Sequence, residues 1–408
     1  MDILIEEYEE SLIAAALQDG KLQGFEIDPA EEEVRWGSVY YAKVKTLDPA
    51  LDAAYLDLDG DNIGLIYNQD LRIKKKDGTI VKGGEKSIGK TLNPGDMIAV
   101  QAKTAYLPKE FDSDTPRENK IPQMSMDITM PGRYLIYCPT LERSRISQRI
   151  KDKTLRKQIR TMLEGIKESS GFIIRAAASG TQTDMLVNEA KILKSAWAEM
   201  ETHFTGDSGQ LIMLGPDAIQ RTLSDHADKL IDRIEVVIMD HYTAVEEWCT
   251  VFAPDLVTKI NPIEIDDALD DLALFYERDI MGQVESLFDS YCMLEHGANI
   301  IIQKTAALTA IDVNKGGDKR GHLATNIEAA AEIARQIRLR NIGGIIIIDF
   351  LKFKSKKEEG EIIAALEKAI NQDPCTVQIH GKTALGLVEI TRKRRTPPLD
   401  ERFEMPYL

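Results

Sequence analysis

The chain has 408 residues, of which 43% are hydrophobic and 29% are charged, and its formal net charge is −16. This length suffices for about two to four domains with buried cores. The acidic balance argues against a protein that coats nucleic acid through its overall charge, although local basic patches can still bind phosphate. No apolar run approaches the length of a membrane span, and the acidic start MDILIEEYEE does not match a signal peptide. We therefore expect a soluble, cytoplasmic protein.

The cysteines and histidines show no metal-binding spacing. The four cysteines are scattered without a Cys-x-x-Cys pair. This pattern indicates neither a zinc ribbon nor a disulfide framework and suits a reducing compartment. We interpret the six histidines as ordinary surface or core residues rather than zinc ligands.

The first 126 residues favour β-structure. Apolar runs at 3–5 and 11–17 predict a pair of strands within residues 1–34. Residues 35–126 contain short alternating strands separated by turns, which is typical of a small β-barrel. A barrel of the OB type binds single-stranded nucleic acid through stacking aromatic side chains and a basic groove.

Two segments are rich in lysine and arginine. Residues 74–90 carry six lysines against two acidic residues, and they form either a solvated hairpin or a contact to RNA phosphate. Residues 143–160 carry eight basic side chains between two expected strands of an α+β unit at 127–207. That density favours phosphate contact over simple solvation.

Residues 208–287 alternate between strand-like and helical stretches. Within them, residues 264–279 are strongly acidic, with interleaved leucines. The leucines favour a helix with a solvated acidic face over a second metal site.

Residues 306–350 predict a strand, a helix and a second strand. The helix is expected to follow a capping-box pattern at Thr325 and Glu328 and to bury one face from Ile327 to Ile337. The continuous β-branched run at 345–348 is typical of a strand that is covered on both faces.

Each of these two strands ends in an aspartate. Asp312 closes the first strand, with Asn314 two residues further on, and Asp349 closes the second. The helical crossover makes the strands parallel, so both carboxylates are expected at the same edge of one sheet. A single aspartate there is better explained as a turn cap, but two at equivalent strand ends indicate a site for a hard cation such as Mg²⁺, with Mn²⁺ as an alternative.

Several of these stretches together resemble the ribonuclease E/G family of bacterial endoribonucleases: GSVYYAKVKTLDPALDAAYLDLDGDNIGLIY, AIDVN, TNIEAAAEIARQIRLRNIGG and IIIIDF. The resemblance implies an α/β and α+β multidomain fold. It comprises a ribonuclease-H-like subdomain with an inserted S1-type OB-fold barrel and a 5′-sensor unit, followed by a DNase-I-like nuclease core. The implied divisions are residues 1–34 and 208–287 for the two parts of the ribonuclease-H-like subdomain, 35–126 for the S1-type domain, 127–207 for the 5′-sensor-like region, 288–397 for the catalytic domain and 398–408 for a tail.

The resemblance also implies roles for individual residues. The family's metal-binding aspartates fall on Asp312 and Asp349, and its associated catalytic asparagine falls on Asn314. The implied RNA contacts are Tyr55 as a base-stacking aromatic, Arg117 and Lys120 beside the scissile phosphate, and Ile146 and Arg175 in a pocket for the RNA 5′-monophosphate. For Tyr55, a place in the barrel core is the alternative.

The chain departs from the family pattern at three expected RNA contacts, where it carries Leu65, Ala176 and Ala384. Ala176 lacks a hydroxyl donor, and one charge-assisted hydrogen bond contributes roughly 1.5–3 kcal/mol, so sensing of the 5′ end is expected to be weak. We expect a short form of the family, without its Cys-x-x-Cys zinc linker and small assembly domain. A homodimer is left open as a partner, but a zinc-linked one is not expected.

These observations predict a magnesium-dependent endoribonuclease that cleaves single-stranded RNA, in ribosomal or transfer RNA processing or in messenger RNA decay. The resemblance implies products with 5′-phosphate and 3′-hydroxyl ends. The three departures motivate the alternative, an RNA-binding protein with little or no catalysis, for example in ribosomal RNA maturation. A DNA nuclease is a weaker third interpretation.

Overall fold

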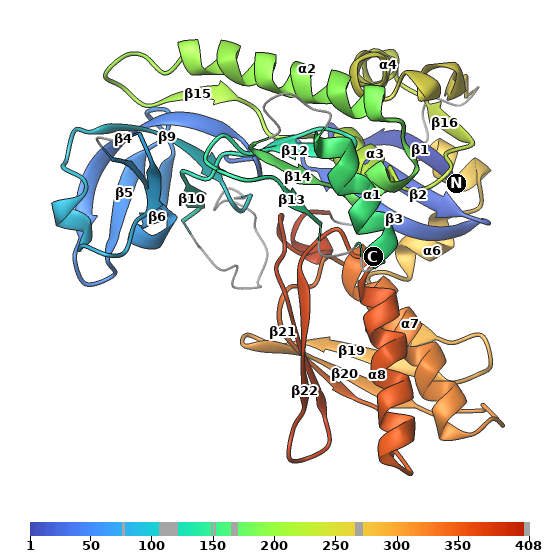
Figure 1. Ribbon diagram of the computed structural model, residues 1–408. Coiled ribbons are helices and arrows are strands. Elements are labelled where there is room, and N and C mark those ends of the chain that lie inside the picture. The colour runs from blue at the N-terminus through green and yellow to red at the C-terminus, as the bar shows by residue number, and fades with distance from the viewer. Residues whose placement is uncertain are drawn as a thin grey trace. The chain divides into compact units, whose positions relative to one another are not determined.

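The computed structural model in Figure 1 describes residues 1–75, 78–105, 121–147, 150, 152–164, 170–265 and 272–403. The chain forms two compact units, one of Met1 with Ala30–Pro262 and one of Asp2–Pro29 with Ile263–Leu408. Both units contain helices and strands, so the predicted mixed α/β class is confirmed. None of the described helices combines the length and hydropathy that a membrane crossing requires.

A closed five-stranded barrel lies in the first unit. β4 pairs with both β5 and β9, and β10 closes the ring between β6 and β9. Alternate residues such as Leu56 and Ile66 point inward into a buried core, which explains the alternating sequence pattern. The ring is consistent with an OB-fold. Its strands are β4 (Val39–Asp48), β5 (Ala53–Asp57), β6 (Ile63–Tyr67), β9 (Met97–Ala102) and β10 (Gln123–Ser125), and β15 (Gln210–Met213) extends it beside β4.

The lysine-rich segment at 74–90 starts at the last residue of β7 (Arg72–Lys74), which forms a hairpin with β8 (Ile80–Lys82). Its base is fixed by Asn68, whose buried side chain donates to Asp52 Oδ2 at 2.8 Å and accepts from the Gly84 amide at 3.1 Å. Because a buried amide is stable only when hydrogen-bonded, this arrangement anchors the hairpin to the barrel.

A smaller sheet with the strand order β11-β12-β14-β13 follows the barrel. The strand expected after the basic segment is short, because β14 gives way to a 3₁₀ helix at Ala176–Gly180. The elements of this part are β11 (Met130–Pro131), β12 (Leu135–Tyr137), β13 (Arg145–Ile146), α1 (Lys153–Glu164), β14 (Phe172–Ile174), α2 (Thr183–Thr202), α3 (Ala218–Asp225), β16 (Arg233–Val236), α4 (Met239–Phe252) and β17 (Ile260–Pro262).

The second unit starts with an antiparallel meander. The predicted strand pair is present and is joined by a third strand. Two short helices from later in the chain belong to the same unit. These elements are β1 (Asp2–Tyr8), β2 (Ser11–Gln18), β3 (Lys21–Asp28), α5 (Ala273–Glu277) and α6 (Met281–Glu285).

A six-stranded sheet with the order β18-β19-β20-β21-β23-β22 forms the rest of this unit. α7 and α8 cover one face, as Figure 1 shows, and pack on Ile311, Ile346 and Ile348. The predicted strand, helix and strand are β20, α7 and β21, and the two strands are parallel neighbours. The bounds are β18 (Tyr291–Met293), β19 (Asn299–Lys304), β20 (Leu308–Asn314), α7 (His322–Leu339), β21 (Gly344–Asp349), α8 (Lys356–Ile370), β22 (Val377–Lys382) and β23 (Val388–Arg392).

Two local predictions here are wrong, and a third holds in part. α7 begins at His322, and the Thr325 hydroxyl donates to Asp318 at 2.8 Å instead of capping the helix. The predicted buried face of α7 is present at Ala330, Ala334 and Ile337, but Ile327 at its start is 37% exposed. β21 is covered on one face only, so Ile345 is 49% exposed.

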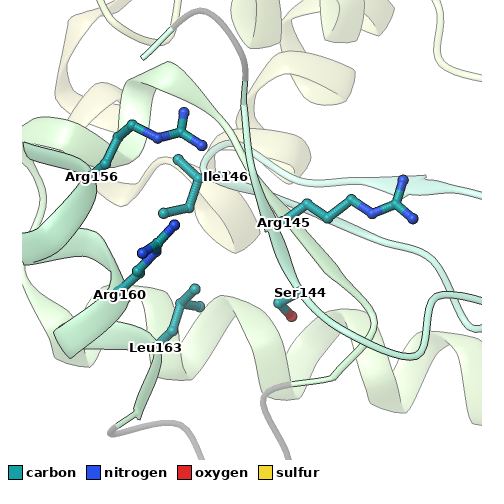
Figure 2. A pocket seen from close by; sticks show the side chains of 6 residues that line it. All are labelled: Ser144, Arg145, Ile146, Arg156, Arg160 and Leu163. Carbon is teal, nitrogen blue, oxygen red and sulfur yellow. The ribbon is translucent and has the colours of Figure 1, made fainter. Parts of the chain in front are cut away.

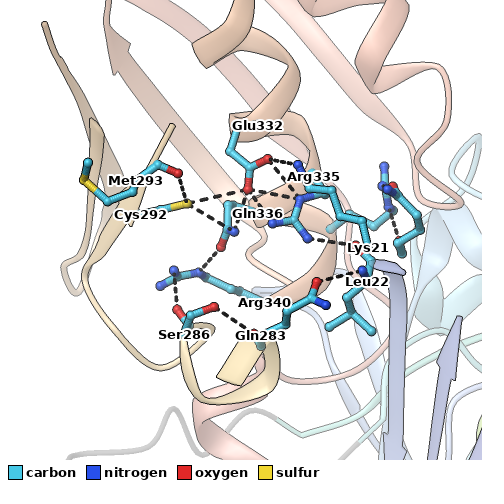
Figure 3. A network of polar contacts seen from close by, with 12 residues as sticks. Lys21, Leu22, Gln283, Ser286, Cys292, Met293, Glu332, Arg335, Gln336 and Arg340 are labelled. Atoms are coloured by element: carbon cyan, nitrogen blue, oxygen red, sulfur yellow. Dashed lines mark hydrogen bonds and ion pairs between the residues drawn. The ribbon is translucent and has the colours of Figure 1, made fainter. Parts of the chain in front are cut away.

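A buried polar network joins the meander to α7 (Figure 3). Glu332 Oε2 accepts from Lys21 Nζ at 3.2 Å, and Arg335 pairs with the same carboxylate while donating to the Leu22 carbonyl at 2.8 Å. Gln336 connects this carboxylate to Arg340 through hydrogen bonds of 2.8 and 2.7 Å. Each charged group therefore has partners of opposite charge or polarity, as burial requires.

Candidate active site

Asp312 and Asp349 lie side by side at the carboxyl ends of β20 and β21. They are register partners in the parallel pair, so their side chains leave the same face of the sheet. Their neighbours in sequence, Ile311 and Ile348, point to the opposite face and are buried under the helices. The alternation therefore places both carboxylates on the face that the helices leave open, where they are exposed.

The two carboxylates and Asn314 form a set of oxygen-rich side chains. Asn314 Nδ2 donates to Asp312 Oδ2 at 2.9 Å, which fixes the orientation of that carboxylate. Within the described residues, neither aspartate forms an ion pair with a lysine or arginine. Two adjacent negative charges without a cationic partner repel each other, and oxygen ligands are the ones that Mg²⁺ prefers. The donor set thus fits a divalent cation.

Asn326 holds the end of β21 in place. Its side chain donates to the Leu351 carbonyl at 2.8 Å and accepts from the Leu351 amide at 3.0 Å, two residues after Asp349. Asn326 is fully buried on α7. This role of Asn326 was not predicted, because its partner lies 25 residues away in the sequence.

Charged residues at the start of α7 pair with one another. Arg320 bridges Asp318 and Glu328, and its hydrogen bonds hold the pKa of Asp318 well below its usual range. Glu295, His296 and Glu328 lie close enough to share an ion. Arg320 and His296 both contact Glu328 Oε2, so a cation of the protein already engages this carboxylate, whereas Glu328 Oε1 has no hydrogen-bond partner among the described residues.

A cavity of about 330 Å³ lies beside β13, in the first unit (Figure 2). Ile146 lines it, together with Arg156 and Arg160 from α1. Arg156 donates to the carbonyls of Ser147 and Ile150 at 3.0 and 2.9 Å, whereas Arg160 forms no hydrogen bond or ion pair with a described residue. An uncompensated guanidinium at a cavity is a donor for an anion such as phosphate.

Comparison with known proteins identifies the family of the chain. Residues 129–395 match the model of the Ribonuclease E/G family. The chain belongs to this family. It is 31% identical to Ribonuclease G of Salmonella typhimurium over 389 residues, which are 93% of this chain and 77% of that protein. It is 30% identical over 414 residues to Ribonuclease E of Synechocystis sp., covering 98% of this chain and 58% of that protein. Membership confirms the predicted class of enzyme, an endoribonuclease.

The family resemblance predicts that Arg175 binds the RNA 5′-monophosphate. In the structure, its side chain is hydrogen-bonded within the protein. Its guanidinium donates to the carbonyls of Gly132 and Ser224 at 3.1 and 2.7 Å and contacts Asp225 at 3.4 Å. Ala176 follows it without a hydroxyl. The structure therefore brings Ile146 to a basic cavity but surrounds Arg175 with protein acceptors.

Of the other residues expected to contact RNA, the structure describes Tyr55. Tyr55 lies half-buried on β5 and does not belong to the barrel core, and Leu65 is its partner on the neighbouring strand. Arg117 and Lys120 lie outside the described residues. Of the predicted site residues that the structure describes, only Asp312, Asn314 and Asp349 are in direct contact or register.

Proposed function

We propose that this chain is a magnesium-dependent endoribonuclease that cleaves single-stranded RNA and leaves 5′-phosphate and 3′-hydroxyl ends. The observation that carries the proposal is the pair Asp312 and Asp349, which are exposed register partners without a cation from the described protein. Family membership supplies RNA as the substrate class. Processing of ribosomal or transfer RNA and decay of messenger RNA are the corresponding roles in the cell.

Asp312 and Asp349 would hold the ion, Mg²⁺ or Mn²⁺. A bound divalent cation supplies positive charge for the scissile phosphate and lowers the pKa of water for in-line attack. Asn314 fixes one carboxylate through its 2.9 Å hydrogen bond, and Asn326 fixes the strand end that carries the other. Both amides thus reduce the reorganisation needed during the reaction.

The remaining residues would guide the RNA. Tyr55 on the outer face of the barrel would stack a base, and Arg156 and Arg160 would contact a phosphate at their cavity. Arg117 and Lys120 are proposed to lie near the scissile phosphate. The ribonuclease-H-like, 5′-sensor-like and DNase-I-like assignments, with their boundaries, belong to the same proposal.

Incubation of the purified protein with a 5′-labelled single-stranded RNA and Mg²⁺ tests this function. We expect cleavage that stops on chelation of the metal, and downstream products that a 5′-phosphate-dependent exonuclease degrades. A deoxy oligomer of the same sequence is the control and should remain intact. Binding without cleavage would instead support the RNA-binding protein without catalysis.

A further inference from the structure

The row of side chains that contains the two carboxylates continues to the edge of the sheet. Asp349 pairs with Asp312, Asp312 pairs with Ile301 on β19, and Ile301 pairs with Tyr291 on β18. Register partners on neighbouring strands point to the same face. Tyr291 therefore shares the open face of the sheet with the carboxylates, two strands from Asp312.

The contacts of β18 confirm which face Tyr291 occupies. Cys292, between Tyr291 and Met293, points to the covered face, where Glu332 and Gln336 of α7 contact its sulfur at 3.6 and 3.5 Å (Figure 3). Because side chains alternate along a strand, Tyr291 and Met293 project to the open face. They are 46% and 54% exposed, and the Tyr291 hydroxyl contacts the Met293 sulfur, so the ring extends along the strand.

Exposed aromatic side chains are rare in this protein. Among the described residues, Tyr291 and Tyr276 are the large exposed aromatics, and only Tyr291 lies on the catalytic sheet. A tyrosine beside a thioether and Ile301 offers a flat apolar surface, which is the chemistry that stacks a nucleobase without selecting its identity. Two strand spacings separate the backbones of Tyr291 and Asp312 by roughly 10 Å, close enough for one short stretch of RNA to reach both side chains.

We propose that Tyr291, with Met293 and Ile301 beside it, stacks a nucleobase next to the scissile phosphate of single-stranded RNA. This inference rests on the proposed function, because the carboxylates fix where that phosphate lies. Tyr291 then holds the strand in register with Asp312 and Asp349. It makes cleavage depend on an intact base at one position beside the cut.

A double-mutant cycle between protein and RNA tests the contact. The substrates are one short single-stranded RNA with a single cleavage site and a series in which one flanking base at a time is removed. For the wild type, one abasic position should lower kcat/KM by roughly 5- to 150-fold, the range for one stacked base. Tyr291→Ala should show the same loss on the intact RNA and no further loss at that position.

Matched variants separate stacking from structure. Tyr291→Phe keeps the ring and should retain both the activity and the abasic penalty, whereas Tyr276→Ala removes an exposed tyrosine elsewhere and should behave as the wild type. Abasic penalties that persist at every position in Tyr291→Ala would overturn the proposal. A second result would also overturn it. If Tyr291→Ala changed a dimer to a monomer in sedimentation and cleavage did not depend on base position, this surface would be a protein contact.

The experiments distinguish a failure of the stacking contact from a failure of the proposed function. If the wild type cleaves RNA but shows no coupling, only the stacking contact is wrong. If the wild type does not cleave, the nuclease proposal is wrong, and the same cycle on equilibrium binding with Ca²⁺ in place of Mg²⁺ decides whether Tyr291 stacks a base.

Discussion

Acidic side chains in the second unit occur in two opposite settings. Asp312 and Asp349 stand exposed at strand ends, next to each other and without a cationic partner among the described residues. Glu332 on α7, which packs on the covered face of the same sheet, is 8% exposed and pairs with Arg335 and Lys21. The difference separates carboxylates that are paired within the protein from carboxylates that remain accessible to a ligand.

Solvation explains the two settings. A buried carboxylate must be paired, because the charge loses its water and must recover that free energy from protein partners. An exposed carboxylate has no such requirement, and a second one beside it only adds repulsion. Placing two of them in register is therefore an arrangement that a bound cation explains better than stability does.

The largest effect is expected when the exposed pair is changed. Asp312→Asn or Asp349→Asn should remove several kcal/mol of transition-state stabilisation, a fall of roughly a hundredfold to a thousandfold in kcat/KM. Stability should stay the same or rise slightly, because a like-charge repulsion is lost. Kinetics on labelled RNA and a denaturant titration measure the two quantities. Asp400→Asn is the control, because Asp400 forms a surface pair with Lys304. Full activity in the Asp312 or Asp349 variant would remove that residue from the proposed site.

Changing the buried carboxylate should lower stability and leave activity nearly unchanged. Glu332→Ala leaves Arg335 without its partner and should lower the free energy of unfolding by about 3–5 kcal/mol. Cleavage per folded molecule should change little. Urea unfolding measures the effect, with the exposed Glu361→Ala on α8 as the control. A normal unfolding midpoint would show that the network does not stabilise the unit.

Acid should weaken the buried pair specifically. Burial raises the pKa of Glu332, but the hydrogen bonds and charge of Arg335 outweigh it and lower the pKa to about 2. The resulting stability is complete above pH 4.5, the ordinary value, and is lost as pH falls through about 2. A shift of this size contributes at most about 3 kcal/mol. Glu332→Gln should unfold with a shallower pH dependence over this range than the wild type, and identical profiles would contradict the assignment.

The comparison extends to arginines. Arg160 faces the cavity without a partner from the described residues, so Arg160→Ala should remove one phosphate contact and reduce the slope of log affinity against log salt by about 0.7. Lys157→Ala on the same helix does not line the cavity and should leave the slope unchanged. Equal slopes for the wild type and Arg160→Ala would exclude the cavity as an RNA contact.

The smallest effect concerns Arg175. Because its guanidinium is held by Gly132, Ser224 and Asp225, and Ala176 supplies no hydroxyl, 5′-monophosphorylated and 5′-hydroxyl RNA should be cleaved at similar rates. Parallel time courses with the two substrates measure the ratio. A strong preference for the monophosphate would show that Arg175 exchanges its internal partners for the RNA.

The pair of carboxylates at the strand ends was predictable because its causes are local. An apolar β-branched run specifies each strand, and a helical crossover between consecutive strands favours parallel pairing, so Asp312 and Asp349 had to reach one edge if the strands were neighbours. The barrel was predictable for a similar reason, since alternating residues such as Leu56 face its core.

Long-range partners decided the rest. The Thr325 hydroxyl donates to Asp318 because the preceding loop folds back onto the helix. Asn326 binds the backbone of Leu351, which follows the next strand, so its contact depends on the packing of that strand. The exposure of Ile345 and Tyr291 follows from helices packing on one face of the sheet. The sequence alone determined which side chains end the two strands, because that depends on neighbours along the chain. Only the tertiary structure decided which charges are neutralised and which face stays open, because burial and pairing depend on residues that are distant in sequence.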